Sequence, residues 1–152
     1  VNKPQYKVRQ AKLNDVMYFY DAVCSILNRQ IDILDFQSNY KEKLKNKDFI
    51  LLVLEADNKT IVGCIVAQKR TTLSNATPFI EIQELYITPK FRKFKAADFL
   101  YNTIDAIAQE QKIFHLLVGC NTNSTLTQNF YTKRGYKIAK KQYTKEIYQG
   151  TY

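Results

Sequence analysis

FIEIQELYITPKFRKFKAADFL, at residues 79–100, contains in one continuous run the patterns of a strand, a basic loop and the start of a helix. Its first nine residues, up to Ile87, are rich in isoleucine and aromatic side chains and predict a β-strand. Pro89 ends the strand, because proline has no N–H to donate to a ladder. From Ala97 the apolar residues recur at the spacing of one helical face, so we expect a helix to follow a short loop.

The loop in this stretch carries a cluster of positive charges. Its four basic side chains are those of Lys90, Arg92, Lys93 and Lys95. The helix that follows offers free backbone N–H groups and a partial positive charge at its N-terminus. A basic loop that leads into such a terminus predicts a binding site for phosphate groups.

The expected strand has a fault in its alternation. Ile80 and Ile82 occupy even positions, whereas Leu85 and Ile87 occupy odd ones. A regular strand keeps its apolar side chains on one parity, because successive residues point to opposite faces. One extra residue near 83–84, a β-bulge, restores a single apolar face, so we expect a bulge there.

The rest of the chain alternates between strand and helix patterns. Apolar runs and turn residues predict strands at 6–9, 49–54, 60–67, 79–87, 113–118, 136–139 and 143–148. Helical periodicity predicts helices at about 15–28, 30–46, 97–108 and 125–134. This order predicts an α/β (α+β) fold in which helices cover a mixed sheet.

Size and cysteine content narrow the class of protein. The 152 residues predict a single domain over residues 1–152. No apolar run approaches the roughly 18 residues that a membrane span needs, so we expect no membrane partner. The three cysteines, Cys24, Cys64 and Cys120, are odd in number, and their spacing fits no zinc motif. We therefore expect no metal site and a reducing, cytoplasmic location.

The charge balance is strongly basic. Lysine and arginine number 23 against 14 aspartates and glutamates, which gives a net charge of +9. Such a charge attracts anions, among them nucleic acids, acidic membranes and phosphorylated cofactors. Lysines also gather at 41–47 and 137–145, where a solvated surface is the usual explanation. The cluster at 90–95 differs from these because it lies at the start of a helix.

Two motifs resemble those of a known family. ITPKFRKFKAA at 87–97 is similar to the acyl-CoA signature of the GNAT superfamily of N-acetyltransferases, in which a strand ends in V-x-P and Q/R-x-x-G-x-G/A opens a helix. YTKRGY at 131–136 is similar to the Y-x-K-x-G-F motif of the same family. The two motifs stand in the family's order, with a helix and a strand between them. The resemblance implies a mixed, mostly antiparallel sheet of about seven strands flanked by four helices.

The first motif departs from the family at one position. Lys95 stands where the family has its first glycine, and Ala97 stands at the second, where the family allows alanine. The glycine lets backbone N–H groups approach the pyrophosphate of CoA. Lys95 adds a side chain there, which either crowds the ligand or pairs with a phosphate.

The resemblance implies acetyl-CoA as co-substrate and assigns a set of residues to it. The backbone of Leu85 and Ile87 would pair with the pantetheine amides like an added strand. The bulge would free an N–H for the acetyl carbonyl. The expected cofactor-binding residues are Leu85, Ile87, Arg92, Lys93, Phe94, Lys95, Ala96, Ala97 and, where the family often has asparagine, Ser124.

Acetyl transfer to an amine needs a base for the amine proton and an acid for the departing thiolate. Glu81 is the first candidate base, because some family members carry their glutamate eleven residues before the position of Arg92. Glu84 is the second candidate base, and the position of the bulge determines on which face of the strand it lies. Tyr131 is the candidate acid, since it matches the family tyrosine near the CoA sulfur. The alternative to catalysis is that the two glutamates are surface acids and that Tyr131 is an aromatic residue of the core.

The resulting hypothesis is an enzyme that transfers acetyl from acetyl-CoA to a primary amine by direct attack. The acceptor is either a small molecule, such as a polyamine, or a protein amine. The alternative is a non-catalytic GNAT-like module that binds acyl-CoA, protein or RNA. Phe91 and Phe94 beside the basic side chains would suit a nucleic acid, although this does not explain the proline or the tyrosine motif. The family also implies a homodimer formed through the late strands.

Overall fold

The computed structural model describes residues 3–57, 59–120 and 124–147. The chain divides into two compact units, residues 1–119 and residues 120–152. The first unit contains β1 (Tyr6–Gln10), α1 (Val16–Leu27), α2 (Ile33–Lys45), β2 (Phe49–Ala56), β3 (Thr60–Arg70), β4 (Phe79–Ile87), α3 (Ala96–Glu110) and β5 (Leu116–Val118). Two short 3-10 helices, η1 (Leu13–Asp15) and η2 (Pro89–Phe94), precede α1 and α3.

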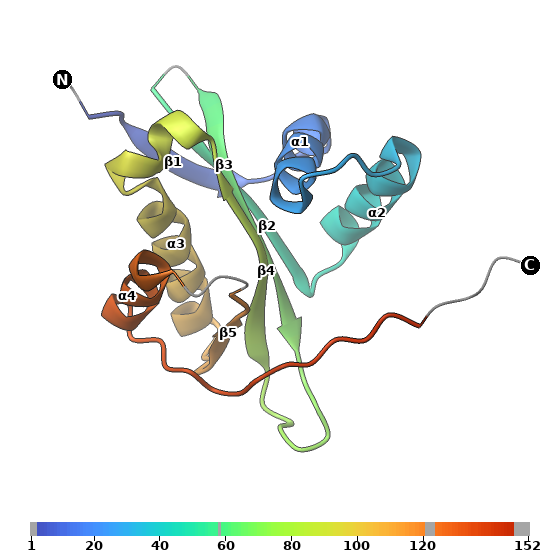
Figure 1. The fold of residues 1–152 in the computed structure, drawn as a ribbon, viewed down its shortest axis with the longest axis vertical. Helices are drawn as coiled ribbons and strands as arrows, with labels where there is room; N and C mark the ends of the chain where they lie inside the picture. Colours follow the sequence, from blue (N-terminus) through green and yellow to red (C-terminus); the bar gives the residue numbers. More distant parts are fainter. Residues whose placement is uncertain (1–2, 58, 121–123, 148–152) are drawn as a thin grey trace, which may run out of the picture. The chain divides into compact units, whose positions relative to one another are not determined.

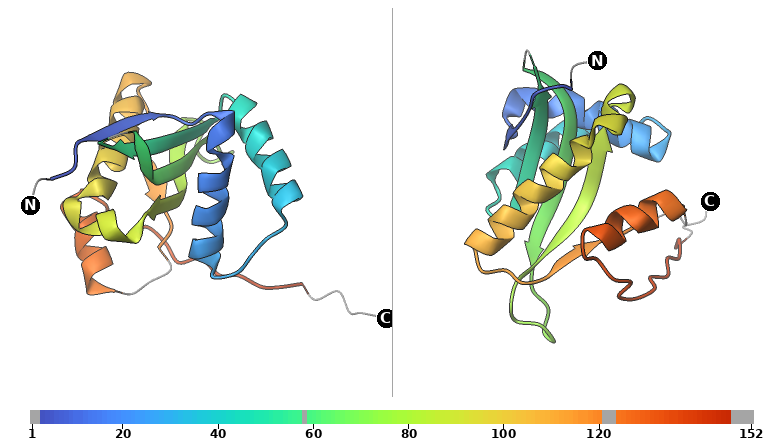
Figure 2. Two further views of the ribbon diagram at one scale, coloured as in Figure 1. Left: turned by 90° about the horizontal axis from the view of Figure 1, so that it is seen from above. Right: turned by 90° about the vertical axis from the view of Figure 1, so that its left-hand side faces the viewer.

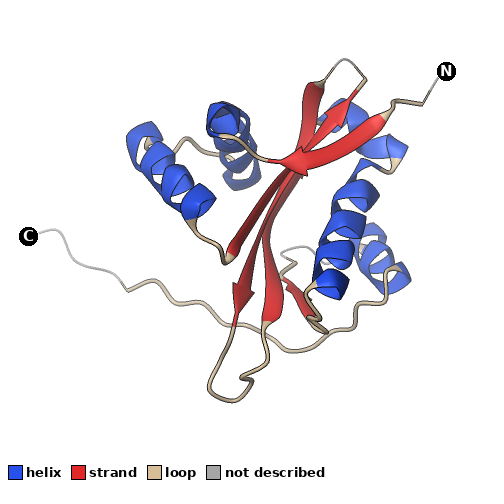
Figure 3. Cartoon of the chain, turned by 180° about the vertical axis from the view of Figure 1, so that it is seen from behind, coloured by secondary structure: helices blue, strands red, loops and turns tan. Residues whose placement is uncertain are grey.

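The strands of the first unit form one mixed, mostly antiparallel sheet in the order β1-β2-β3-β4-β5. The pairs β1–β2, β2–β3 and β3–β4 are antiparallel, and only β4–β5 is parallel. A long loop, residues 71–78, joins β3 to β4 at one end of the sheet (Figure 3). The expected fold class is confirmed, and the central strands lie where the sequence pattern predicts them.

Helices cover both faces of the sheet. In Figure 1, α1 and α2 lie on one side of the strands and α3 lies on the other, and the right-hand view of Figure 2 shows α3 running across them. On α3, the residues at helical spacing are buried: Leu100, Tyr101, Ile104 and Ala108. On the opposite face, Phe19 of α1 and Tyr40 of α2 are buried against β2 and β3. No helix in the described ranges is long and apolar enough to cross a bilayer.

The expected bulge is present in β4. Val66 pairs with Glu84 and Ala67 pairs with Ile82, so Gln83 is the extra residue between two regular stretches. Ile80 and Ile82 are buried before the bulge, and Ile87 is buried after it. The change of parity in the sequence is therefore the direct signal of a real irregularity in the ladder.

The second unit contains a single described helix, α4 (Thr125–Lys133). Gly135 follows it with φ +89°, the left-handed conformation in which glycine commonly ends a helix. The N–H of Tyr136 donates to the carbonyl of Tyr131 at 3.0 Å and so closes the last turn.

The expected strands at 136–139 and 143–148 are absent from residues 136–147, and residue 148 lies outside the described part of the chain. Ile138, Tyr143 and Ile147 are 94%, 92% and 75% exposed. Apolar side chains in this segment therefore bury little surface to offset the entropy of ordering the backbone. Within the described residues the sheet has five strands rather than about seven.

Candidate functional site

β4 is paired on both sides along its first half and on one side along its second half. β5 pairs with β4 only from Ile80 to Ile82. Past Ile82, no strand among the described residues pairs with that edge, whereas β3 follows β4 as far as Ile87. An unpaired strand edge presents N–H and C=O groups to whatever lies beside it.

Hydrogen bonds at the two ends of β4 show which backbone groups face the open edge. The N–H of Ile80 donates to the carbonyl of His115 at 3.0 Å, on the β5 side. The N–H of Thr88 donates to the carbonyl of Val62 at 2.8 Å, on the β3 side. Because successive residues alternate in direction, Leu85 and Ile87 direct their backbone groups to the open edge.

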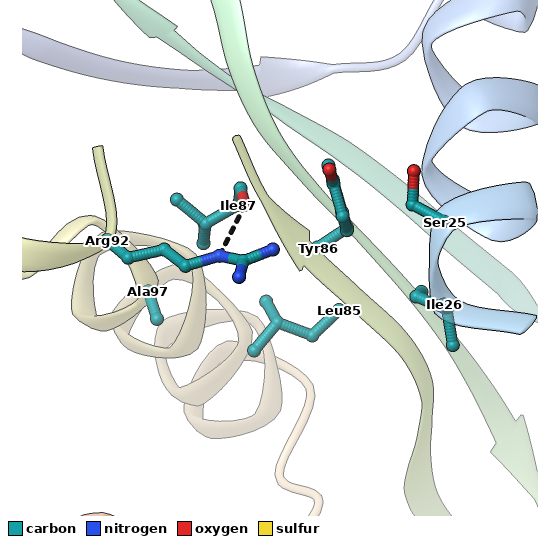
Figure 4. A pocket seen from close by; sticks show the side chains of 7 residues that line it. All are labelled: Ser25, Ile26, Leu85, Tyr86, Ile87, Arg92 and Ala97. Carbon is teal, nitrogen blue, oxygen red and sulfur yellow. Dashed lines mark hydrogen bonds between the residues drawn. The ribbon is translucent and has the colours of Figure 1, made fainter. Parts of the chain in front are cut away.

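A pocket of about 360 Å³ lies beside this half of β4. Figure 4 shows the end of α1 on one side of it, β4 at its base, and η2 with the start of α3 on the other side. The strand contributes three consecutive residues, α1 contributes two, and η2 and α3 contribute one each. The residues that line the pocket are Ser25, Ile26, Leu85, Tyr86, Ile87, Arg92 and Ala97.

Arg92 is fixed at the end of β4 by two contacts. Its Nε donates to the carbonyl of Ile87 at 2.9 Å, as the dashed line in Figure 4 shows. Its guanidinium carbon lies 5.4 Å from the centroid of the Tyr86 ring, a cation–π distance. The guanidinium has five N–H donors in all, so the bond to Ile87 leaves donors available for an anion.

The backbone just before α3 has a conformation that glycine favours. Lys95 has φ +57°, in the left-handed region that glycine adopts without steric cost. α3 begins at the next residue, Ala96, and the side chain of Lys95, the N-cap residue, makes no capping hydrogen bond. Ala96 is fully buried, and Ala97 lines the pocket. Small residues at the start of a helix suit a phosphate that approaches closely.

The bulge brings the two candidate carboxylates onto one face of β4. Glu81 pairs with Gln68 and Glu84 pairs with Val66, two residues of β3 that lie on the same face. Glu81 forms an ion pair with Arg70 at 2.9 Å and accepts a hydrogen bond from Gln83 at 3.1 Å. Glu81 is thus held by neighbouring side chains.

Glu84 has a different environment. Its side chain is half-buried, and it forms no ion pair with a residue in the described ranges. Burial raises the pKa of this carboxyl, because the charged form loses hydration. Tyr86, which lines the pocket, lies two residues farther along the same face. A carboxyl with a raised pKa is a candidate for a general base.

The expected cofactor-binding residues are distributed over both units. Leu85, Ile87, Arg92 and Ala97 line the pocket. Four others lie from the end of η2 to the first residue of α3, namely Lys93, Phe94, Lys95 and Ala96. The ninth, Ser124, belongs to the second unit.

The second unit holds two of the candidate site residues. Ser124 immediately precedes α4, and its carbonyl accepts from the N–H of Gln128 at 3.0 Å. The ring of Tyr131 lies edge-on to those of Phe130 and Tyr136, at centroid distances of 5.3 and 5.4 Å. The roles of Ser124 and Tyr131 stay predictions.

Three pocket residues were not among the sequence candidates. Ser25 and Ile26 lie near the end of α1, and Tyr86 lies between the two residues expected to pair with the cofactor. The expected bulge could have indicated Tyr86. After Gln83 the even-numbered residues of β4 lie on the face opposite Leu85, and Tyr86 is one of them. Nothing in the helical periodicity of α1 marks Ser25 or Ile26 as pocket residues.

Residues 18–136 match the family described as the acetyltransferase (GNAT) family. No curated protein matches the chain.

Among solved structures, three illustrate the similarity. An aminoglycoside antibiotic 6'-N-acetyltransferase from Acinetobacter baumannii is 10% identical, with a TM-score of 0.78 over 96% of this chain and 100% of that one. A predicted acetyltransferase from Clostridium acetobutylicum, solved with acetyl-CoA, is 18% identical, with a TM-score of 0.76 over 93% and 96%. A GNAT family acetyltransferase from Staphylococcus aureus is 17% identical, with a TM-score of 0.73 over 93% and 98%. At these identities the likeness shows the fold alone.

Proposed function

This chain belongs to the acetyltransferase (GNAT) family, and we propose that it transfers an acetyl group to a primary amine by direct attack. The family takes its acetyl group from acetyl-CoA. One observation carries the proposal: the open edge of β4, Arg92 and the start of α3 meet at a single pocket. Strand edges bind amides, and basic helix starts bind phosphates, so the pocket matches both parts of CoA.

Each part of the cofactor has residues suited to hold it. The backbone groups of Leu85 and the N–H of Ile87 would pair with the pantetheine amides, since Arg92 already occupies the Ile87 carbonyl. The spare guanidinium donors of Arg92 and the first N–H groups of α3 would bind the phosphates, with Lys93 and Lys95 adding positive charge. When bound there, acetyl-CoA supplies an acetyl thioester for attack by the amine.

Glu84 is the residue we propose as general base. An ammonium group must lose a proton before its nitrogen can attack, and a carboxylate with a raised pKa accepts that proton more readily near neutral pH. Burial gives Glu84 this property. Glu81, the first candidate from the sequence, is the alternative, but its ion pair with Arg70 favours a structural role.

Tyr131 is the proposed general acid. This role comes from its place in the YTKRGY motif at 131–136 and from the chemistry of a phenol, which can protonate a departing thiolate. Replacing Tyr131 with phenylalanine removes the hydroxyl and keeps the ring. We expect Tyr131→Phe to lower kcat by about tenfold or more, because general acids contribute roughly 10² or more.

Two assays on the purified protein test the proposal. Thermal unfolding with acetyl-CoA tests binding, since a ligand at a hundredfold excess over Kd stabilises the native state by about 2.7 kcal/mol. Release of free thiol from acetyl-CoA, with and without an amine, tests transfer. Arg92→Ala is the matched variant, and Lys112→Ala, in the exposed turn after α3, is its control.

The outcomes separate the enzyme from a binding module. We expect acetyl-CoA to raise the melting temperature by several degrees and an amine to increase thiol release, with both effects weakened in Arg92→Ala and unchanged in Lys112→Ala. Stabilisation without amine-dependent thiol release would support a non-catalytic module. The absence of stabilisation would contradict the assigned cofactor site.

A further inference from the structure

We propose that this protein has a second binding groove, which takes an extended segment of a protein partner in which acidic and apolar residues alternate. The groove lies along the edge of β2, at the place where β1 ends. It shares no residue with the pocket beside β4, so binding there does not depend on the proposed function.

The edge of β2 is open at the beginning of the strand. β2 starts at Phe49, whereas β1 follows it only as far as Gln10, which lies opposite Leu52. The N–H of Ala11 makes one more bond, to the carbonyl of Leu51 at 2.9 Å. Beyond that bond no strand of the described residues pairs with this edge, and the carbonyl of Phe49, two residues earlier, faces it. An extended peptide can add to such an edge as a strand.

A cavity of about 490 Å³ lies at this edge, and the end of α2 forms its basic wall. Lys43 and Lys45 belong to the last turn of α2, and Lys47 lies in the turn that follows. None of the three forms an ion pair with a residue in the described ranges. Three positive charges within five residues favour a ligand that carries carboxylates.

The other wall of the cavity is mainly apolar. Leu51 packs into the core cluster beneath α1 and α2, so its neighbours Ile50 and Leu52 face the side of α3. Ile107 of α3 joins them in the lining, and Ile50 and Ile107 are only half-buried. Glu110, the one acid in the described lining, also belongs to α3. An apolar side chain would cover the two isoleucines, whereas a carboxylate on this side would be repelled by Glu110.

The two walls match the geometry of an extended peptide. Successive side chains of a strand point to opposite faces of the sheet. A strand added along the edge of β2 would therefore direct every second side chain to the lysine wall and the others to Ile50 and Ile107. Acidic residues at the first set of positions and apolar residues at the second satisfy both walls at once.

A single-stranded nucleic acid would also bring negative charge, but the groove suits it less. Such ligands bind by stacking their bases on aromatic side chains. Phe49 is the only aromatic residue in the described lining, and Lys43 Nζ lies over its ring, 4.2 Å from the centroid. The charges and the open strand edge together favour a peptide.

Binding of labelled probes to the full chain, measured by fluorescence anisotropy, tests this groove. Two six-residue peptides have the same composition: in one, glutamate and valine alternate, and in the other, three glutamates precede three valines. A third peptide alternates lysine and valine, and a ten-residue oligothymidylate represents nucleic acid. We expect the alternating acidic peptide to bind about tenfold more tightly than any other probe, because it alone presents carboxylates and apolar side chains on opposite faces.

A pair of variants locates the binding. Lys45→Glu reverses one charge of the basic wall, and Lys41→Glu makes the same change one turn earlier in α2, at an exposed residue outside the described lining. We expect Lys45→Glu to weaken binding of the alternating acidic peptide by about tenfold at low salt and Lys41→Glu by less than about twofold. Stabilisation by acetyl-CoA should be the same in both variants, since the groove is separate from the cofactor pocket.

Each contrary result overturns a stated part of the proposal. Equal binding of the two acidic peptides would overturn the strand-like placement. Equal losses in Lys45→Glu and Lys41→Glu would mean that the net charge of +9 attracts the peptide without a groove. Tighter binding of the oligothymidylate, lost in Lys45→Glu, would replace the peptide with a nucleic acid. The absence of binding by every probe would overturn the groove itself and leave the proposed function unaffected.

Discussion

The two halves of β4 belong to one strand but have different surroundings. Residues 79–82 pair with β3 on one side, and residues 80–82 pair with β5 on the other. Ile80 is fully buried. Residues 84–87 are paired with β3 alone, and their other edge borders the pocket. Gln83, the bulge residue, separates the two halves.

The difference shows how a strand can serve both stability and binding. Both halves are rich in isoleucine, leucine and aromatic residues, so their composition does not separate them. The first half uses its backbone groups and its side chains within the fold. The second half keeps the groups of Leu85 and Ile87 directed to the open edge, where a ligand can pair with them. The assignment of function to the second half is the proposal that the following changes test.

The largest expected effect is on the paired half. Ile80→Ala removes three carbon atoms from a fully buried side chain, and such changes cost about 2–5 kcal/mol because they leave a cavity. We expect a loss of about 3 kcal/mol in the free energy of unfolding, measured by urea denaturation.

Leu85→Ala is the matched change in the open half. Leu85 is only partly buried and lines the pocket, so we expect it to cost about 1 kcal/mol of stability and to weaken the binding of acetyl-CoA. Equal losses of stability in the two variants would remove the distinction between the halves.

The second effect concerns the two carboxylates on the same face. Glu84→Gln should lower kcat/KM by about 10²-fold, since it replaces the proposed base with a group that cannot accept a proton. Glu81→Gln, on the other side of the bulge, should change it by less than about threefold, because Glu81 is already engaged with Arg70. The reverse ranking would restore Glu81 as the base.

Glu84→Gln should lower activity but raise the stability of the folded protein at neutral pH. Burial raises the folded-state pKa of Glu84 above its ordinary value of 4.5, so the folded state favours the protonated form. The stability from this group is fully present below pH 4.5 and is lost as the pH rises through the folded pKa. Glu84→Gln removes this loss, and its melting temperature at pH 7 should exceed that of the unchanged protein. At pH 4 the difference should shrink.

The pH profile of kcat/KM gives a third test. Activity should fall as the pH decreases through the raised pKa of Glu84, because the protonated carboxyl cannot act as a base. The falling limb should disappear in Glu84→Gln, which has only its low residual rate. If Glu81→Gln removes the limb instead, the base lies in the paired half.

The smallest expected effect is at the start of α3. Lys95 already has the left-handed backbone that the family's glycine provides, and its side chain is exposed, so we expect it to add charge for a phosphate. Lys95→Gly should weaken acetyl-CoA binding about threefold at low salt and less at high salt.

Lys112 provides a matched control for this change. It is also an exposed lysine with a left-handed backbone, φ +58°, and it lies after the end of α3. Lys112→Gly should alter stability by a similar amount and leave acetyl-CoA binding unchanged. Tighter binding by Lys95→Gly would mean that the lysine crowds the ligand.

The sequence predicted the central part of the fold well. The parity change between Ile82 and Leu85 predicted the bulge, and Pro89 with the period change at Ala97 predicted the end of β4 and the start of α3, because these signals are local. The prediction of two strands in 136–147 was wrong: a short run of apolar and β-branched residues does not by itself supply a partner strand.

The site was predictable only in part. Leu85, Ile87, Arg92 and Ala97 are adjacent in the chain, so one motif named them together. Ser25 and Ile26 come from a helix about sixty residues away, and only tertiary packing brings them to the pocket. The difference between Glu81 and Glu84 depends on the ion pair with Arg70, which a pattern in one strand does not reveal.

Amide hydrogen exchange along β4, with and without acetyl-CoA, tests the central claim most directly. The N–H groups of Leu85 and Ile87 face the open edge, so they should exchange faster than that of Ile80 in the free protein and slow down when acetyl-CoA binds. The exchange of Ile80 and Ile82 should change little. Slowing confined to residues 79–82, or no slowing in either half while acetyl-CoA is bound, would contradict the assignment of the cofactor to the open half of β4.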